Sequence, residues 1–146
     1  MDAWEDFRAS LAEDLAQLPE GASLVLRAPE PAAPRATRRR FWRPEQQPAS
    51  YVQFLSNPPV LMGECSAPRS RGGSADLTPE QEAAVLALGW REPGEVPEYR
   101  SAQEPNYWRD WTDEPRRHDA ASELAVATLR GPLAVPSPDG VTVQRS

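Results

Sequence analysis

The chain has no lysine and no isoleucine, and only one cysteine and one histidine among its 146 residues. The lone cysteine, Cys65, excludes an internal disulfide, so we expect a reducing compartment, the cytoplasm. No apolar run approaches the roughly 20 residues that a membrane-spanning helix needs, so we expect no membrane association. The first residues are acidic and therefore lack the basic-then-apolar layout of a signal peptide.

Charge is unevenly distributed along the chain. All 16 basic residues are arginine, and the net charge is −6. Residues 35–74 carry +5, whereas residues 1–34 carry −5 and residues 75–146 carry −6. An acidic chain with one basic block is a poor general binder of nucleic acid. The length suits one domain, which we expect over residues 1–135, with a flexible tail over residues 136–146.

Three segments have the pattern of a helix. The first carries an apolar stripe at three- and four-residue steps, formed by Trp4, Phe7, Leu11, Leu15 and Leu18. The second begins with a capping box that Thr78 opens, and Gly89 ends it in a left-handed conformation. The third is Ala- and Leu-rich. It follows an N-cap at Thr112 or Asp113 and ends at Gly131.

Five short segments have the pattern of a strand, bounded by proline- and glycine-rich breaks. They are residues 23–27, 37–43, 49–56, 60–65 and 106–111. Strands that follow one another with no helix between them pair as an antiparallel meander. The sequence therefore predicts a single α+β domain in the order α-β-β-β-β-α-β-α, with three helices flanking an antiparallel sheet.

Four large aromatic residues follow the second helix within 22 positions: Trp90, Tyr107, Trp108 and Trp111. Tryptophan and tyrosine offer a large contact area at low entropic cost, and they dominate protein-binding hot spots. The alternative is that Trp90 and one of the later tryptophans close the hydrophobic core. Alternation along a strand sends Tyr107 and Trp108 to opposite faces, so the cluster cannot all point inward.

A second candidate site is the arginine-rich segment 35–43, from Arg35 to Arg43. In a strand, Arg38, Arg40 and Trp42 share one face. Basic residues interleaved with aromatics can bind phosphates while the rings stack on bases. A solvated edge strand and a surface for an anionic protein are the other two interpretations of this segment.

The sequence offers little for catalysis. A Cys–His pair would need His118 and Cys65 within hydrogen-bond reach, with a third group to orient the imidazole. One cysteine and one histidine without paired spacing do not make a metal site. The glycine pair after Arg71 lacks the lysine of a phosphate-binding loop. We therefore predict no enzyme activity, no cofactor and no metal.

Three ordered motifs carry a family resemblance: Leu-Ala-Leu-Gly-Trp at 86–90, Pro-Asn-Tyr-Trp-Arg-Asp-Trp at 105–111, and the Ala/Leu-rich run 120–130. Together with the strand at 50–54, they resemble the small actinobacterial domains grouped as TY-Chap. These belong to the superfamily of type III secretion chaperones and YbjN-like peptide-binding chaperones. The resemblance implies a helix–sheet–helix fold, often dimeric, that binds peptide segments or partner proteins and catalyses no reaction.

The leading hypothesis is a cytoplasmic, non-enzymatic chaperone-like or adaptor domain. It would bind an extended or helical segment of a partner protein on its sheet face or in a groove near the third helix. The residues predicted to contact the partner are Trp90, Tyr107, Trp108, Trp111, Arg38, Arg40 and Trp42. Two alternatives are a nucleic-acid-binding or regulatory module that uses segment 35–43, and a homodimeric assembly subunit. Binding that weakens steeply as salt rises would identify the nucleic-acid-binding module. A dimer mass that survives dilution would identify the assembly subunit.

Overall fold

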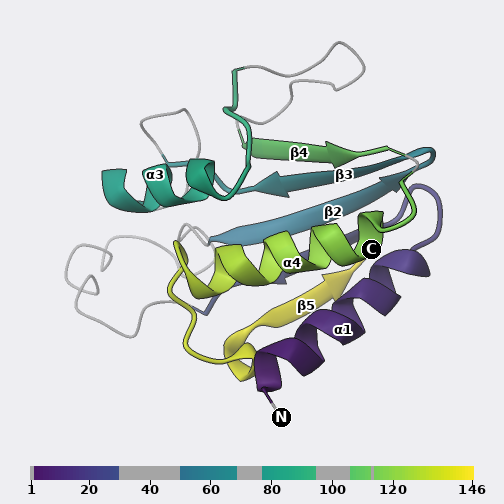
Figure 1. Cartoon of the computed structure of the whole chain (residues 1–146), viewed down its shortest axis with the longest axis horizontal. Helices are drawn as coiled ribbons and strands as arrows, with labels where there is room; N and C mark the ends of the chain where they lie inside the picture. The colour runs from purple at the N-terminus through teal and green to yellow at the C-terminus, as the bar shows by residue number, and fades with distance from the viewer. Residues whose placement is uncertain (1, 30–49, 69–76, 95–105, 113) are drawn as a thin grey trace.

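The computed structural model describes residues 2–29, 50–68, 77–94, 106–112 and 114–146 (Figure 1). Its helices are α1 (Ala3–Ala16), α3 (Pro79–Ala87), α4 (Arg117–Arg130) and the short 3-10 helix η3 (Pro138–Gly140). Its strands are β1 (Ser23–Arg27), β2 (Tyr51–Asn57), β3 (Val60–Cys65), β4 (Tyr107–Trp111) and β5 (Thr142–Arg145).

The five strands form one sheet in the order β4-β3-β2-β1-β5, and every neighbouring pair is antiparallel. Pro58 and Pro59 make the tight turn between β2 and β3, where Asn57 is paired with Val60. The predicted α+β class with an antiparallel sheet and three α-helices is confirmed. The predicted strand at 37–43 lies outside the described residues.

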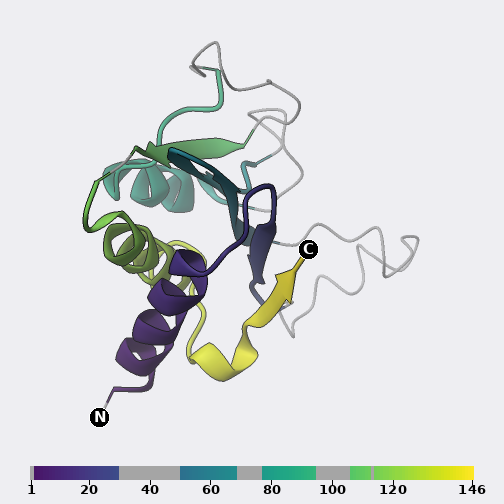
Figure 2. The same cartoon turned by 90° about the vertical axis from the view of Figure 1, so that its right-hand side faces the viewer.

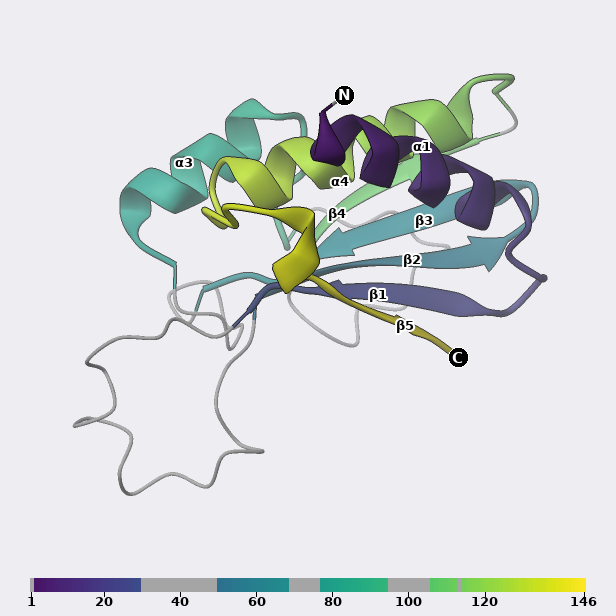
Figure 3. The ribbon, with the colours of Figure 1, turned by 90° about the horizontal axis from the view of Figure 1, so that it is seen from below.

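The hydrophobic core lies between the helices and one face of the sheet (Figures 2 and 3). The predicted stripe of α1 buries Trp4, Leu11 and Leu15, and Leu18 and Phe7 pack at its margin. Buried residues alternate along β1, β2 and β3, as a half-covered sheet requires. In β4 the neighbours Tyr107 and Trp108 are both buried, and β5 has no buried residue. The sheet residues that face the core are Leu24, Leu26, Val52, Phe54, Leu61, Cys65, Tyr107 and Trp111.

Polar contacts fix the helix ends that the sequence marks. The Thr78 hydroxyl accepts a hydrogen bond from the Gln81 amide at 3.1 Å, and the Gln81 side chain accepts one from the Thr78 amide at 2.7 Å. The predicted capping box of α3 is thus confirmed, as is the left-handed conformation of Gly89, whose φ is +113°. At α1, Asp2 caps the Trp4 amide, whereas Glu5 pairs with Arg8 at 2.8 Å.

Two expectations about the C-terminal half are wrong. Helix α4 begins at Arg117 with no side-chain cap, four to five residues after the predicted caps Thr112 and Asp113, the latter of which lies outside the described residues. The flexible tail predicted for residues 136–146 is also wrong. It holds η3 and then β5, which pairs with β1 along its whole length because its β-branched residues suit a strand.

Candidate functional site

One face of the sheet has no helix over it among the described residues, as the side view shows (Figure 2). We call it the open face. Because side chains alternate along a strand, the residues next to the buried ones point to it. By register they are Ser23, Val25, Arg27, Tyr51, Gln53, Leu55, Asn57, Val60, Met62, Glu64, Trp108, Asp110, Thr142 and Gln144.

The half of the open face nearest the β2–β3 turn carries a small apolar group, bordered by Ser23, Asn57 and Asp110. Leu55 and Met62 are direct cross-strand neighbours, and Leu55 is 37% exposed. Val25 and Val60, both half-buried, flank this pair on the neighbouring positions of β1 and β3. Accessible leucine, methionine and valine side chains on adjacent strands form a surface on which apolar side chains of another chain can pack.

The other half is polar and internally hydrogen-bonded. The Glu64 carboxylate accepts hydrogen bonds from the side-chain amides of Gln53 and Asn106, both at 3.0 Å. Asn106 also donates to the Tyr51 hydroxyl at 2.9 Å, and the Arg27 guanidinium lies 5.9 Å from the centre of the Tyr51 ring. This network fixes the half-buried Gln53 amide and Glu64 carboxylate beside the apolar group, where they can bind the backbone of an extended chain, whereas Asn106 is buried and supports them.

Trp108 lies at the margin of the polar half, on the outer strand β4. It is opposite Glu64 in the register and forms an isolated backbone bridge with Arg91. Its indole nitrogen donates to the Glu92 carbonyl at 3.1 Å, and the Arg91 guanidinium lies 5.4 Å from the centre of the ring. The residue is only 8% exposed, so its ring forms the wall of this surface and offers little free area.

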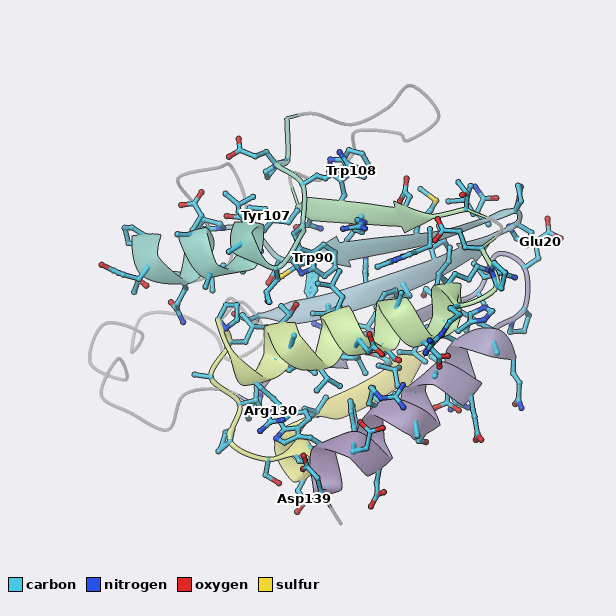
Figure 4. All side chains as sticks on the ribbon, in the orientation of Figure 1. Glu20, Trp90, Tyr107, Trp108, Arg130 and Asp139 are labelled. Carbon is cyan, nitrogen blue, oxygen red and sulfur yellow. The ribbon has the colours of Figure 1, made fainter. Side chains whose placement is uncertain are left out.

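The other three aromatic residues of the predicted site are in the core. Trp90 lies between α3 and α4 (Figure 4), where its indole donates to the Thr128 hydroxyl at 2.9 Å. Trp111 packs against Phe54 with ring centres 6.1 Å apart, and Tyr107 is fully buried. The structure therefore separates the cluster, as the alternation argument anticipated: Trp108 on the open face, Tyr107 and Trp111 on the covered one.

Arg38, Arg40 and Trp42, the remaining residues of the predicted site, lie outside the described residues. The sheet face was one of the two surfaces predicted to bind the partner, but its residues Leu55 and Met62 were not among the predicted contacts. Tyr51, Leu55 and Met62 do alternate with buried neighbours, so the signal was present in the segments 51–57 and 60–65. Which of the two faces the helices would leave uncovered depends on tertiary packing, and alternation alone does not specify it.

Cys65 and His118 lie in different settings. Cys65 is fully buried, and burial raises the pKa of its thiol to about 12, so it is not a nucleophile at neutral pH. It ends β3 opposite Tyr107, whereas His118 is in the first turn of α4, which follows the other end of β4. Partial burial, and then the neighbouring Arg117, lower the pKa of His118.

The described part of the chain shows no group of three or more His, Cys, Asp or Glu side chains that could hold a metal ion. Among the described helices, none is long and apolar enough to cross a membrane.

The fold and the open face together define a class of protein: a small α+β domain with a helix-covered core and an amphipathic sheet surface suited to another polypeptide. The whole chain, residues 1–146, matches the family described as T3SS (YopN, CesT) and YbjN peptide-binding chaperone 3, or TY-Chap3. The chain belongs to this family of peptide-binding chaperones, as the motifs at 86–90, 105–111 and 120–130 suggested. No curated protein and no solved structure matches it.

Proposed function

We propose that this domain is a non-enzymatic chaperone or adaptor that holds an extended segment of a partner protein against its open face. The observation that carries the proposal is the apolar Leu55–Met62 pair beside a hydrogen-bonded polar network, on a face without a described helix. Membership in a peptide-binding chaperone family supports it. The cytoplasm stays a prediction from the single cysteine.

The two halves of the open face would have separate tasks. Apolar side chains of the partner would pack on Leu55, Met62 and Val25, which supplies affinity through buried apolar area. Backbone groups of the partner would hydrogen-bond to the side-chain amide of Gln53, which is held in place by Glu64. An extended segment suits this arrangement because alternate side chains meet the surface while the backbone stays within hydrogen-bond reach.

The predicted aromatic residues divide between contact and support. Trp108 would form one wall of the partner site, with its ring oriented by Arg91 and the Glu92 carbonyl. Trp90, Tyr107 and Trp111 would act as support, since their rings anchor β4 and α3 to the core. Arg38, Arg40 and Trp42 remain predicted contacts for acidic flanks of the partner.

Charge favours a protein partner over nucleic acid. The described ranges hold eight arginines and fifteen acidic residues. Such a surface repels phosphates on average, and affinity for nucleic acid comes largely from phosphate contacts.

A peptide selection with matched leucine variants tests this proposal. Peptides from a random phage-displayed library are selected on the full-length chain, and their affinities are measured by fluorescence anisotropy. Leu55 and Leu88 are both 37% exposed, but Leu55 is on the open face and Leu88 caps α3. We expect Leu55→Asp to weaken binding at least tenfold and Leu88→Asp to change it less than twofold. Equal losses, or a larger loss for Leu88→Asp, would contradict the proposal.

A further inference from the structure

Strand β5 (Thr142–Arg145) lies on the sheet without contributing a side chain to the core. All four of its residues are exposed, and Val143, at 44%, is the most exposed large hydrophobic residue of the described chain. Its neighbour β1 is different, because Leu24 and Leu26 are fully buried. β5 is therefore a surface strand placed on a well-anchored edge (Figure 3).

The hydrogen-bond pattern shows which backbone groups hold β5. Ser23 and Ser146 exchange both backbone hydrogen bonds, at 2.9 and 3.0 Å. In an antiparallel pair such exchanges recur every second residue, so Val25 with Gln144 and Arg27 with Thr142 are the next hydrogen-bonded pairs. The amides of Val25 and Arg27 thus point to β5, and those of Leu24 and Leu26 point to β2.

The side chains of β5 occupy two positions along β1. Val143 is opposite Leu26 and Arg145 is opposite Leu24, both in non-hydrogen-bonded pairs, where facing side chains are closest. On the helix side, the Arg145 guanidinium forms an ion pair with Asp14 of α1 at 2.8 Å. The edge of β1 therefore presents an apolar position beside Leu26 and an acidic one between Leu24 and Asp14.

We propose that the edge of β1 is a strand-binding site for an extended segment of a partner protein, and that β5 occupies it as an intramolecular competitor. The segment it accepts has the pattern of β5: a β-branched apolar residue, then an arginine or lysine two positions later. This inference rests on the proposed function for the kind of ligand, a peptide, but it uses a different surface.

The energetics favour exchange at this edge. The four side chains that leave with β5 are all exposed, and Arg145, at 62%, keeps most of its side chain in solvent, so its ion pair with Asp14 adds little. A partner strand would restore the same backbone hydrogen bonds and the same two side-chain contacts. A strand with few buried contacts belongs to the part of a fold that opens most easily.

The direct test uses a full-length chain in which one β5 hydrogen bond is removed. Gln144→Pro removes an amide that points to β1, whereas Gln144→Ala removes the same side chain and keeps the amide. The probe is a fluorescein-labelled peptide with the sequence of residues 137–146, followed by anisotropy. We expect the Gln144→Pro chain to bind it at least tenfold more tightly than the Gln144→Ala chain, because β5 no longer competes. Equal affinities would overturn the inference.

The probe peptide supplies its own matched control. N-methylation at its residue equivalent to Gln144 should abolish binding, because that amide faces β1, whereas N-methylation at the residue equivalent to Val143 should leave binding unchanged. In the Gln144→Pro chain, Asp14→Asn should weaken binding at least threefold. Two methylated peptides of equal affinity would overturn the inference.

Hydrogen exchange of the unmodified chain gives a test that needs no variant. We expect the amides of Val25 and Arg27 to exchange at the rate of Gln144, and much faster than those of Leu24 and Leu26. Equal protection of all four β1 amides would overturn the inference. None of these readouts depends on Leu55, so a failure here leaves the open-face proposal standing, and the reverse also holds.

Discussion

The indole nitrogen of Trp90 donates a 2.9 Å hydrogen bond to the hydroxyl of Thr128, which donates in turn to the Leu124 carbonyl at 2.6 Å. Trp90 follows α3 directly after Gly89, and Thr128 is on α4. The pair therefore joins the two helices inside the core, where Thr128 is fully buried. Trp90 therefore has a structural role, because its hydrogen bond to Thr128 attaches the end of α3 to α4.

A double-mutant cycle on this pair should show coupling. Trp90→Phe removes the indole donor and keeps an aromatic ring, and Thr128→Val removes the hydroxyl and keeps the branched shape. Each single change should lower the free energy of unfolding by about 1–3 kcal/mol. Trp90→Phe leaves the Thr128 hydroxyl without its donor and reduces the ring, and Thr128→Val leaves the Trp90 indole nitrogen without its acceptor. The double variant should cost clearly less than the sum, as measured by urea unfolding. Strict additivity would show that the bond contributes nothing.

A second prediction concerns the close approach of Trp111 to β3. A Cβ atom added at Gly63 would lie 2.9 Å from Cζ3 of Trp111 and 3.1 Å from the Arg109 carbonyl oxygen. Gly63→Ala should therefore destabilise the fold by about 1–3 kcal/mol through overpacking. Gly94→Ala is the matched control, because nothing lies within 4 Å of its added Cβ. Thermal melts that show equal stability for the two variants would refute this explanation.

Local signals in the sequence were sufficient for α1, α3 and the strands β1 to β4. The apolar stripe of α1, the capping box at Thr78 and the Pro58–Pro59 turn each depend on neighbours within a few residues, so sequence alone shows them. Each of these features appears in the structure within about two residues of its predicted place.

Non-local packing decided what the sequence did not show. β5 was missed because a four-residue strand forms only when the distant edge of β1 offers its hydrogen bonds. The start of α4 was predicted too early because good capping residues at 112 and 113 precede a turn, where the Glu114 amide donates to the Thr112 carbonyl at 2.6 Å. The functional assignment of the aromatics likewise depended on which face the helices cover.

A third prediction tests the docking of α1 on the core. Leu15 is buried, whereas Leu18, one turn later, is only partly buried. Leu15→Ala should cost about 2–5 kcal/mol, since it leaves a cavity between α1 and the rest of the core. Leu18→Ala should cost clearly less. Chemical denaturation of both variants measures the difference, and a Leu15→Ala chain as stable as the wild type would show that α1 is not docked as described.

A fourth prediction follows from the burial of Cys65. Burial raises the pKa of its thiol from 9.0 to about 12, because the thiolate would lie in an apolar environment without water. In the unfolded chain the thiol ionises near its ordinary pKa. The protonated thiol therefore makes its full contribution to the free energy of unfolding below about pH 9. That contribution is lost as the pH rises from about 9 toward 12. The native chain should react with a thiol reagent at pH 8 only on unfolding.

The matched comparison for this prediction is Cys65→Ser against the wild type. A serine hydroxyl does not ionise in this range, so the variant should lose less stability than the wild type between pH 9 and pH 11, although it is less stable overall. The urea midpoints of the wild type and of Cys65→Ser, each measured at pH 9 and pH 11, give the pH dependence of stability for both chains. Parallel pH dependences, or rapid labelling of the native thiol at pH 8 in the absence of denaturant, would show that Cys65 is accessible and that its burial does not control its chemistry.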